Sequence, residues 1–135
     1  MIAAVCLDDR NGMLFNGRRL SRDRAQQEDL LALCGEKKLR IGSFSAKLFQ
    51  AHEERVVVDD DFLTAAGAGE IVFVEDRGLL PLSARLEGVI VYRWNRAYPS
   101  DMQFDLDLSA FTCTERVEFP GNSHDIITRE VYMRT

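Results

Sequence analysis

The sequence predicts an α/β fold: a central, mostly parallel sheet with flanking helices, completed by an antiparallel hairpin at its C-terminal end. Short apolar runs alternate with helix-forming segments in the first part of the chain, which is typical of parallel strands joined by right-handed crossovers. After residue 110 the helix signals stop. Two stretches there alternate between one side and the other, as the strands of an antiparallel pair do.

The first element is a buried strand over residues 2–7, because a continuous apolar run followed by turn residues suits a strand covered on both faces. An irregular loop with two Asn-Gly pairs follows. A helix then begins near Ser21, whose hydroxyl is suited to cap it, and Asp23 favours the positive end of its dipole. Gly35 is expected to end this helix, since glycine adopts the left-handed conformation without steric cost.

Further strand and helix repeats follow. Apolar or β-branched runs predict strands over residues 39–41, 55–58 and 71–74. Ser43 or Ser45 is expected to cap a helix after the first of these strands, and a short helix is expected around residues 62–66.

The last part of the chain is expected to contain strands only, at residues 89–92, 111–118 and 125–133. Pro, Gly and Asn at residues 120–122 indicate a turn between the last two. The sequence shows no repeat, low-complexity tract or linker, so we expect one domain spanning residues 1–135.

Composition and charge argue against several classes of protein. The chain is 46% hydrophobic and 29% charged, which suits a globular protein and not a disordered one. Its net charge of -5 argues against a nucleic-acid binder. No apolar run reaches the roughly 18 to 20 residues that cross a bilayer, and no basic region precedes the first apolar run. Three widely spaced cysteines are expected to be free thiols, so we expect a cytoplasmic protein without a membrane partner.

Several short segments resemble one known family. Residues 1–5 (Met-Ile-Ala-Ala-Val), 9–13 (Asp-Arg-Asn-Gly-Met) and 20–23 (Leu-Ser-Arg-Asp) are similar to the start of bacterial dihydrofolate reductases. Residues 101–104 (Asp-Met-Gln-Phe) resemble the family's acid-x-x-Phe segment, and residues 122–124 (Asn-Ser-His) resemble its closing hairpin. The resemblance runs over nearly the whole chain and implies a dihydrofolate reductase-like fold.

The resemblance also implies a substrate site. Asp23 matches the buried carboxylate that holds the family's pteridine ring and supports its protonation, and burial is expected to raise the pKa of such an acid. The alternative is that Asp23 is only a first-turn helix acid. Ala4 and Val5 of the first strand are expected to face the substrate. Arg18 and Gln27 stand where the family has aromatic residues, which leaves the expected pocket more polar and basic.

The same resemblance points to a cofactor site that has changed. Gly42, Ser43 and Ser45 match the strand end and helix start that face a cofactor phosphate, but Ser43 replaces the family's usual basic residue. After the strand at residues 71–74, the family's Gly-Gly pair is replaced by Glu-Asp-Arg at residues 75–77. Glycines let a backbone approach a pyrophosphate, whereas carboxylates repel it, so we expect ordinary NADPH binding to be lost.

Two functions remain open. The first is a dihydrofolate reductase-like module that binds a small molecule or a protein, with a homodimer also considered. The second is an NADPH-dependent reductase of a pterin-like heterocycle. Four arginines at residues 18–24 form either a solvated face or an anion site at the pocket mouth. Trp94 and Tyr98 either pack internally or mark a partner surface.

Other chemistry finds little support in the sequence. The two histidines, His52 and His124, lie far apart, which does not suit a metal hydrolase. Ser, His and Asp at residues 123–125 are consecutive, so their side chains diverge along a strand and do not form a nucleophile triad with one another. Three adjacent acids at residues 59–61 are more typical of a turn and a helix cap than of a cation site.

Overall fold

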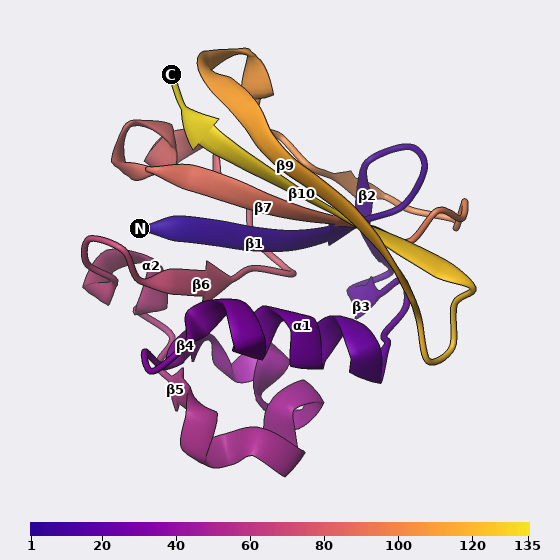
Figure 1. The fold of residues 1–135 in the computed structure, drawn as a ribbon, viewed down its shortest axis with the longest axis horizontal. Helices are drawn as coiled ribbons and strands as arrows, with labels where there is room; N and C mark the ends of the chain where they lie inside the picture. Colours follow the sequence, from indigo (N-terminus) through magenta and orange to yellow (C-terminus); the bar gives the residue numbers. More distant parts are fainter.

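The computed structural model describes residues 1–135 and has the predicted α/β architecture (Figure 1). The parallel part of its main sheet consists of β1 (Ile2–Leu7), β4 (Leu39–Ile41), β5 (Val56–Val58), β6 (Ile71–Phe73) and β7 (Gly88–Arg93). β1 lies between β6 and β7, which explains its continuous apolar sequence. No helix of the chain is both long and apolar enough to cross a membrane.

The predicted antiparallel hairpin completes the sheet. It consists of β9 (Phe111–Pro120) and β10 (Ile126–Arg134), and β10 pairs with β7. The resulting order is β5-β4-β6-β1-β7-β10-β9, so β9 forms one edge. Most of β9 is exposed to solvent, because no layer covers either of its faces along most of its length.

The longest α-helix, α1 (Arg24–Cys34), packs on one face of the sheet (Figure 1). The prediction that Ser21 caps it is wrong: Asp23 is the N-cap, and its carboxylate accepts a hydrogen bond from the backbone N–H of Ala25. Gly35 ends the helix with a positive φ of 60°, as expected.

The other helical segments are one 13-residue segment, which is interrupted by non-helical backbone at Phe49 and His52, and three short ones. They are η1 (Ser43–Arg55), α2 (Phe62–Ala65), η2 (Leu80–Arg85) and η3 (Leu108–Ala110), of which the three η segments are 3₁₀ helices. The prediction that Ser43 or Ser45 caps a helix is wrong, because Gly42 is the N-cap of η1 and no side chain caps it. Both serine hydroxyls bond to carboxylates instead.

The loop expected after the first strand contributes two strands to a second, smaller sheet. Its strands are β2 (Gly12–Phe15), β3 (Arg18–Arg19) and β8 (Met102–Gln103), in the order β3-β2-β8. Asn16 and Gly17 both take positive φ, as the two central residues of a tight hairpin turn require. Tertiary pairing with β8 therefore turns part of a loop-like sequence into strands.

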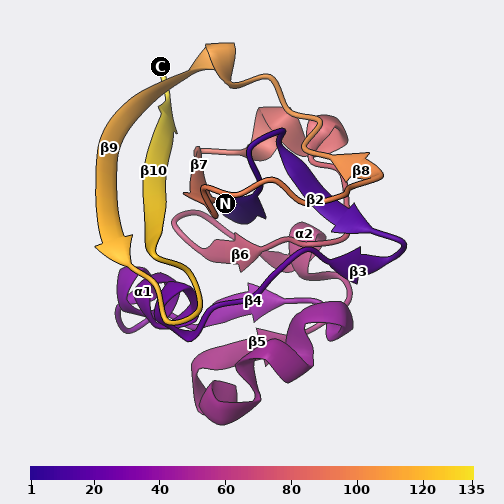
Figure 2. The same cartoon turned by 90° about the vertical axis from the view of Figure 1, so that its right-hand side faces the viewer.

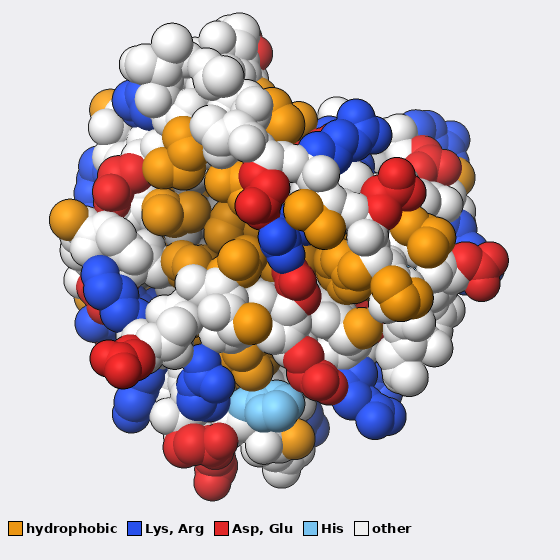
Figure 3. Space-filling model, viewed as in Figure 1, with side chains coloured by type: hydrophobic (Ala, Val, Ile, Leu, Met, Phe, Trp, Pro, Cys, Tyr) orange, Lys and Arg blue, Asp and Glu red, His pale blue; other side chains and the backbone are white.

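Apolar residues pack on both faces of the main sheet. On β1, Ala3, Val5 and Leu7 enter one core and Ala4 enters the other, which α1 covers. Coverage on the α1 face is incomplete, and apolar side chains remain visible beside the helix in Figure 3. Arg129 crosses this face to pair with Asp29 of α1 at 2.7 Å, so the hairpin is joined to the helix by charge as well as by packing.

Gly88 of β7 is required by the close approach of β10. A Cβ atom built on Gly88 would lie 2.7 Å from the carbonyl oxygen of Tyr132, which cannot withdraw without disturbing the β7–β10 pairing. We predict that Gly88→Ala lowers the free energy of unfolding by about 1–3 kcal/mol, measured by urea denaturation. Gly67→Ala is the matched control, since its Cβ would meet nothing closer than 3.5 Å. Equal stability of the two variants would contradict the prediction.

Candidate functional site

The candidate site lies along the edge of the main sheet that is formed by the C-terminal ends of its parallel strands, and not along the outer strand β9. β1, β4 and β6 run in the same direction, so the segments that follow Leu7, Ile41 and Phe73 gather at one edge. β10 runs the other way and begins beside the end of β7, which brings the β9–β10 turn to the same edge. Figure 2 shows this turn against the chain that leads from β3 into α1.

Two neighbouring cavities open at this edge. The larger one, called here the arginine pocket, has a volume of about 650 Å³ and is lined by Gly17, Arg18, Arg19, Ser21, Arg22, Phe44 and Ser123. The second has a volume of about 370 Å³ and lies between the start of α1, η1 and the β9–β10 turn. Arg22 and Ser123 line both cavities, so they separate the two spaces.

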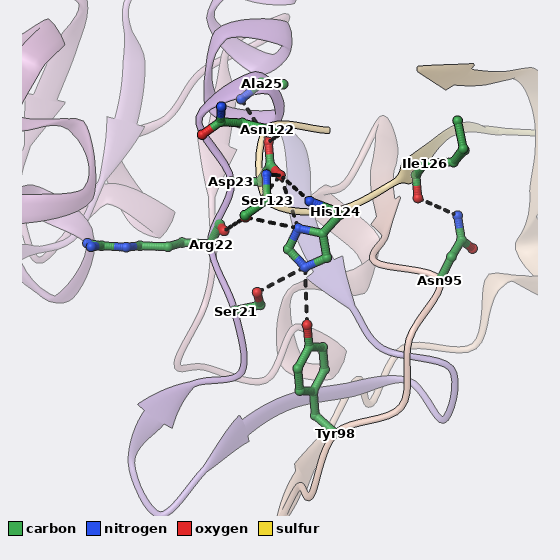
Figure 4. A network of polar contacts seen from close by, with 10 residues as sticks. All are labelled: Ser21, Arg22, Asp23, Ala25, Asn95, Tyr98, Asn122, Ser123, His124 and Ile126. Atoms are coloured by element: carbon green, nitrogen blue, oxygen red, sulfur yellow. Dashed lines mark hydrogen bonds and ion pairs between the residues drawn. The ribbon is translucent and has the colours of Figure 1, made fainter. Parts of the chain in front are cut away.

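Asp23 holds the β9–β10 turn against the start of α1 (Figure 4). Its buried carboxylate accepts the backbone N–H groups of Ala25, Asn122, Ser123 and His124 at 2.7–3.1 Å, and the ring Nδ1 of His124 lies 3.0 Å away. One carboxylate therefore caps a helix and gathers three successive amides of a turn 100 residues away in sequence.

The expectation that burial raises the pKa of Asp23 is wrong. Burial alone acts in that direction, but the hydrogen bonds from Asn122, His124, Ser123 and Ala25 outweigh it and hold the pKa well below its ordinary value. Asp23 is therefore a fully ionised group whose oxygens are already bonded within the chain.

His124 continues the network away from Asp23. Its Nε2 lies 3.0 Å from the Ser21 hydroxyl and 3.1 Å from the Tyr98 hydroxyl, and both side chains point at the ring in Figure 4. The Trp94 ring stacks on the imidazole, with centroids 4.6 Å apart. Trp94 is buried, so its role is internal packing and the alternative of a partner surface is wrong for this residue.

No sequence signal identified this network. The pattern at residues 123–125 drew attention to three consecutive side chains, whereas His124 in fact contacts Ser21, Asp23 and Tyr98. These residues come from three distant segments.

The residues expected to face a cofactor phosphate are bonded to carboxylates of the chain. The backbone N–H and hydroxyl of Ser43 donate to Asp60 at 2.8 and 2.9 Å, and the buried hydroxyl of Ser45 donates to Glu75 at 2.7 Å. A Cβ at Gly42 would approach the Phe62 ring at 3.0 Å, so this glycine accommodates an aromatic side chain.

The four arginines divide into different environments. Arg19 forms a two-point ion pair with Glu75, at 2.7 and 2.9 Å, and donates to the carbonyl of Phe44. Arg24 lines only the second cavity. Arg18 and Arg22 are exposed in the arginine pocket and make no ion pair, so their charges remain available to a ligand.

The structure brings only some of the predicted substrate residues together. Arg18 lines the arginine pocket, while Asp23 and Gln27 line the second cavity. Ala4 and Val5 are fully buried in the two cores and line neither cavity. β1 thus packs in the hydrophobic cores next to the site, and these two residues do not line it.

Comparison with known proteins supports the fold. No protein-family model and no curated protein sequence matches the chain. Among solved structures, the chain is similar to dihydrofolate reductase from Enterococcus faecalis complexed with NADP(H) and RAB-propyl. The TM-score is 0.69 at 14% identity, and the match covers 100% of this chain and 96% of that chain. This confirms the dihydrofolate reductase-like fold that the sequence indicated.

Asp23→Asn tests whether the carboxylate holds this edge together. We expect it to lower the free energy of unfolding at pH 7 by about 3 kcal/mol, because buried donors lose an ionised acceptor. The folded-state pKa of Asp23 is depressed, so its stabilisation is complete above the unfolded-state pKa of about 3.9 and is lost as the pH falls toward the folded-state value. The difference from wild type should therefore shrink by about 1 kcal/mol at pH 3, measured by urea denaturation.

The control for this variant is Asp125→Asn. Asp125 is exposed in the same turn, and its replacement should change the free energy of unfolding by about 0.5 kcal/mol or less. A difference between wild type and Asp23→Asn that stays constant from pH 7 to pH 3 would contradict the role given to Asp23.

Proposed function

We propose that this dihydrofolate reductase-like chain binds a small anionic molecule in the arginine pocket and has lost the ordinary mode of NADPH binding. The observation that carries the proposal is the pair Arg18 and Arg22, two exposed guanidinium groups without ion pairs at one cavity of about 650 Å³. In a chain with a net charge of -5, such a local concentration of free positive charge favours an anion.

The other groups around the pocket suit a small ligand. Guanidinium groups recognise carboxylates and phosphates through two parallel hydrogen bonds. The Ser21 and Ser123 hydroxyls add polar contacts, and the Phe44 ring adds an apolar surface. The volume lies within the roughly 300–1,000 Å³ range of small-molecule pockets.

The contacts of Ser43, Ser45 and Asp23 support the loss of ordinary NADPH binding. Asp60 and Glu75 are bonded to the two serines, so each place suited to a phosphate already has a negative group of the chain. Asp23 is ionised and covered by the β9–β10 turn, which makes it unsuited to proton donation in a reductase.

The second candidate is an NADPH-dependent reductase of a pterin-like heterocycle. The favouring observation is the match over the full chain to a structure that was solved with NADP(H). In this alternative Asp23 orients the substrate, which requires the β9–β10 turn to move away from its carboxylate. The NADPH titration below distinguishes the two candidates.

Pyrophosphate is a suitable probe for the arginine pocket. We predict that it binds the wild-type chain and that the double variant Arg18→Gln/Arg22→Gln weakens binding about tenfold or more, measured by calorimetric titration at low salt. Arg10→Gln/Arg96→Gln makes the same charge change at exposed positions outside the pocket and should retain the affinity. Equal weakening by both double variants would show that net charge, and not the pocket, attracts the anion.

NADPH itself tests the proposed loss of cofactor binding. We predict no saturable binding at micromolar NADPH in a fluorescence titration, since Asp60 and Glu75 keep the serines from a phosphate. Micromolar affinity, together with NADPH oxidation on addition of dihydrofolate, would favour the reductase instead.

A further inference from the structure

We propose that Ser21, His124 and Asp23 form a nucleophile, a general base and an orienting carboxylate that cleave esters of small anionic acids through an acyl intermediate on Ser21. The triad follows from contacts that are independent of the pocket charges. Only the anionic character of the substrate rests on the proposed function, through Arg18 and Arg22.

The order of contacts is the one that nucleophilic catalysis requires. The Ser21 hydroxyl lies 3.0 Å from Nε2 of His124, and Nδ1 of the same ring lies 3.0 Å from the Asp23 carboxylate (Figure 4). An ionised carboxylate only accepts hydrogen bonds, so Nδ1 carries a proton, and in the neutral imidazole Nε2 presents its lone pair to Ser21. This arrangement of roles defines a serine triad irrespective of sequence order or fold.

The base and its orienting carboxylate are held rigidly. The Asp23 carboxylate is fixed by four backbone amides from α1 and the β9–β10 turn. The imidazole is buried and stacks on Trp94 with an angle of 18° between the rings. Asp23 and Trp94 therefore act as positioning residues that keep Nε2 aimed at Ser21, and little reorganisation is needed for proton transfer.

The nucleophile is accessible, unlike its partners. Ser21 is half-buried and lines the arginine pocket, whereas His124 and Asp23 do not line it. An ester bound there would have its anionic group near Arg18 and Arg22 and its carbonyl group toward Ser21. The proposed reaction therefore takes place in the same cavity that binds the anion.

The reaction balances without a cofactor. Ser21 Oγ attacks the ester carbonyl carbon while its proton passes to Nε2 of His124. Collapse of the tetrahedral adduct breaks the bond to the alcohol oxygen, which takes the proton from His124. Water then attacks the acyl-serine with His124 as base, which releases the acid and restores the Ser21 hydroxyl.

Tyr98 carries the second hydroxyl group next to Nε2 of His124, and its reactivity is compared with that of Ser21. Its hydroxyl lies 3.1 Å from the same Nε2, so it is the alternative group that His124 could activate. Attack by the Tyr98 phenol and attack by the Ser21 hydroxyl would give adducts on different residues, and peptide mapping separates them.

The test uses a fluorophosphonate probe, which loses fluoride when an activated serine attacks its phosphorus atom. We expect one adduct per chain, mapped to Ser21 by peptide mass spectrometry. Ser21→Ala should abolish labelling, and His124→Gln should slow it by about 100-fold or more. Ser109→Ala, on exposed η3, is the control and should label as wild type does. An adduct on Tyr98 or Ser123, or no adduct at Ser21, would overturn the triad.

A second variant at Ser21 tests activation by His124 in a chain whose folding is checked separately. Ser21→Cys preserves the side-chain shape and should give a thiol that iodoacetamide alkylates faster than the exposed Cys113, because His124 takes its proton. Thermal melting of Ser21→Ala and Ser21→Cys checks that both variants are folded. Alkylation no faster than at Cys113 in a folded Ser21→Cys chain would contradict activation by His124.

Hydrolysis of two esters separates the triad from the anion pocket. Mono-4-nitrophenyl succinate carries a carboxylate in its acyl group and 4-nitrophenyl acetate does not. We expect kcat/KM to favour the succinate about tenfold, and Arg18→Gln/Arg22→Gln to lower kcat/KM for the succinate about tenfold. Ser21 labelling without the preference would support the triad and contradict the anionic substrate. Pyrophosphate binding without Ser21 labelling would overturn the triad and leave the proposed binding function in place.

Discussion

The site depends on the Asp23 carboxylate. It satisfies the first turn of α1 and three amides of the β9–β10 turn at once, and it also fixes the His124 ring. Gly121 shows how closely the parts fit, since a Cβ there would lie 2.5 Å from the carbonyl oxygen of His124 and 2.8 Å from Asp23. A buried charge is stable here because almost every lone pair has a donor. Ser21, His124 and Arg22 owe their common location to this contact.

Side-chain carboxylates that accept hydrogen bonds from backbone N–H groups also join other segments of the fold. Asp8 receives the amides of Gly12 and Tyr98, which ties the small sheet to the segment after β7. Asp60 receives the amide of Ser43, and Asp105 receives that of Leu79. Acidic side chains of the chain thus accept hydrogen bonds from backbone amides at several junctions. Arg18 and Arg22 remain as unpaired cations of the arginine pocket, which is the basis for the proposal that this dihydrofolate reductase-like framework binds a small anion.

The strands and the helix end that depend on short-range sequence patterns were predictable from the sequence. The apolar run at residues 2–7 is β1, Gly35 ends α1, and the alternation near the C-terminus forms the β9–β10 hairpin. Each depends on neighbours a few residues away, so periodicity and turn residues suffice. The helix start was less predictable, because Ser21 and Asp23 are both suitable caps. The position of Ser123 and His124 decides between them, since the β9–β10 turn draws the Asp23 carboxylate to the helix end.

The sequence by itself determined the order along the chain of the strands in the main sheet, the excess of negative charge and the arginines around residue 20, since these are properties of composition and short-range pattern. Only the tertiary structure decided what those groups do. Burial favours a neutral Asp23, but amides contributed by a turn 100 residues away reverse that preference. Ser21 becomes a candidate nucleophile for the same reason, because its base lies at the other end of the chain. Electrostatic and hydrogen-bonding environments depend on proximity in space, which only the folded sheet creates.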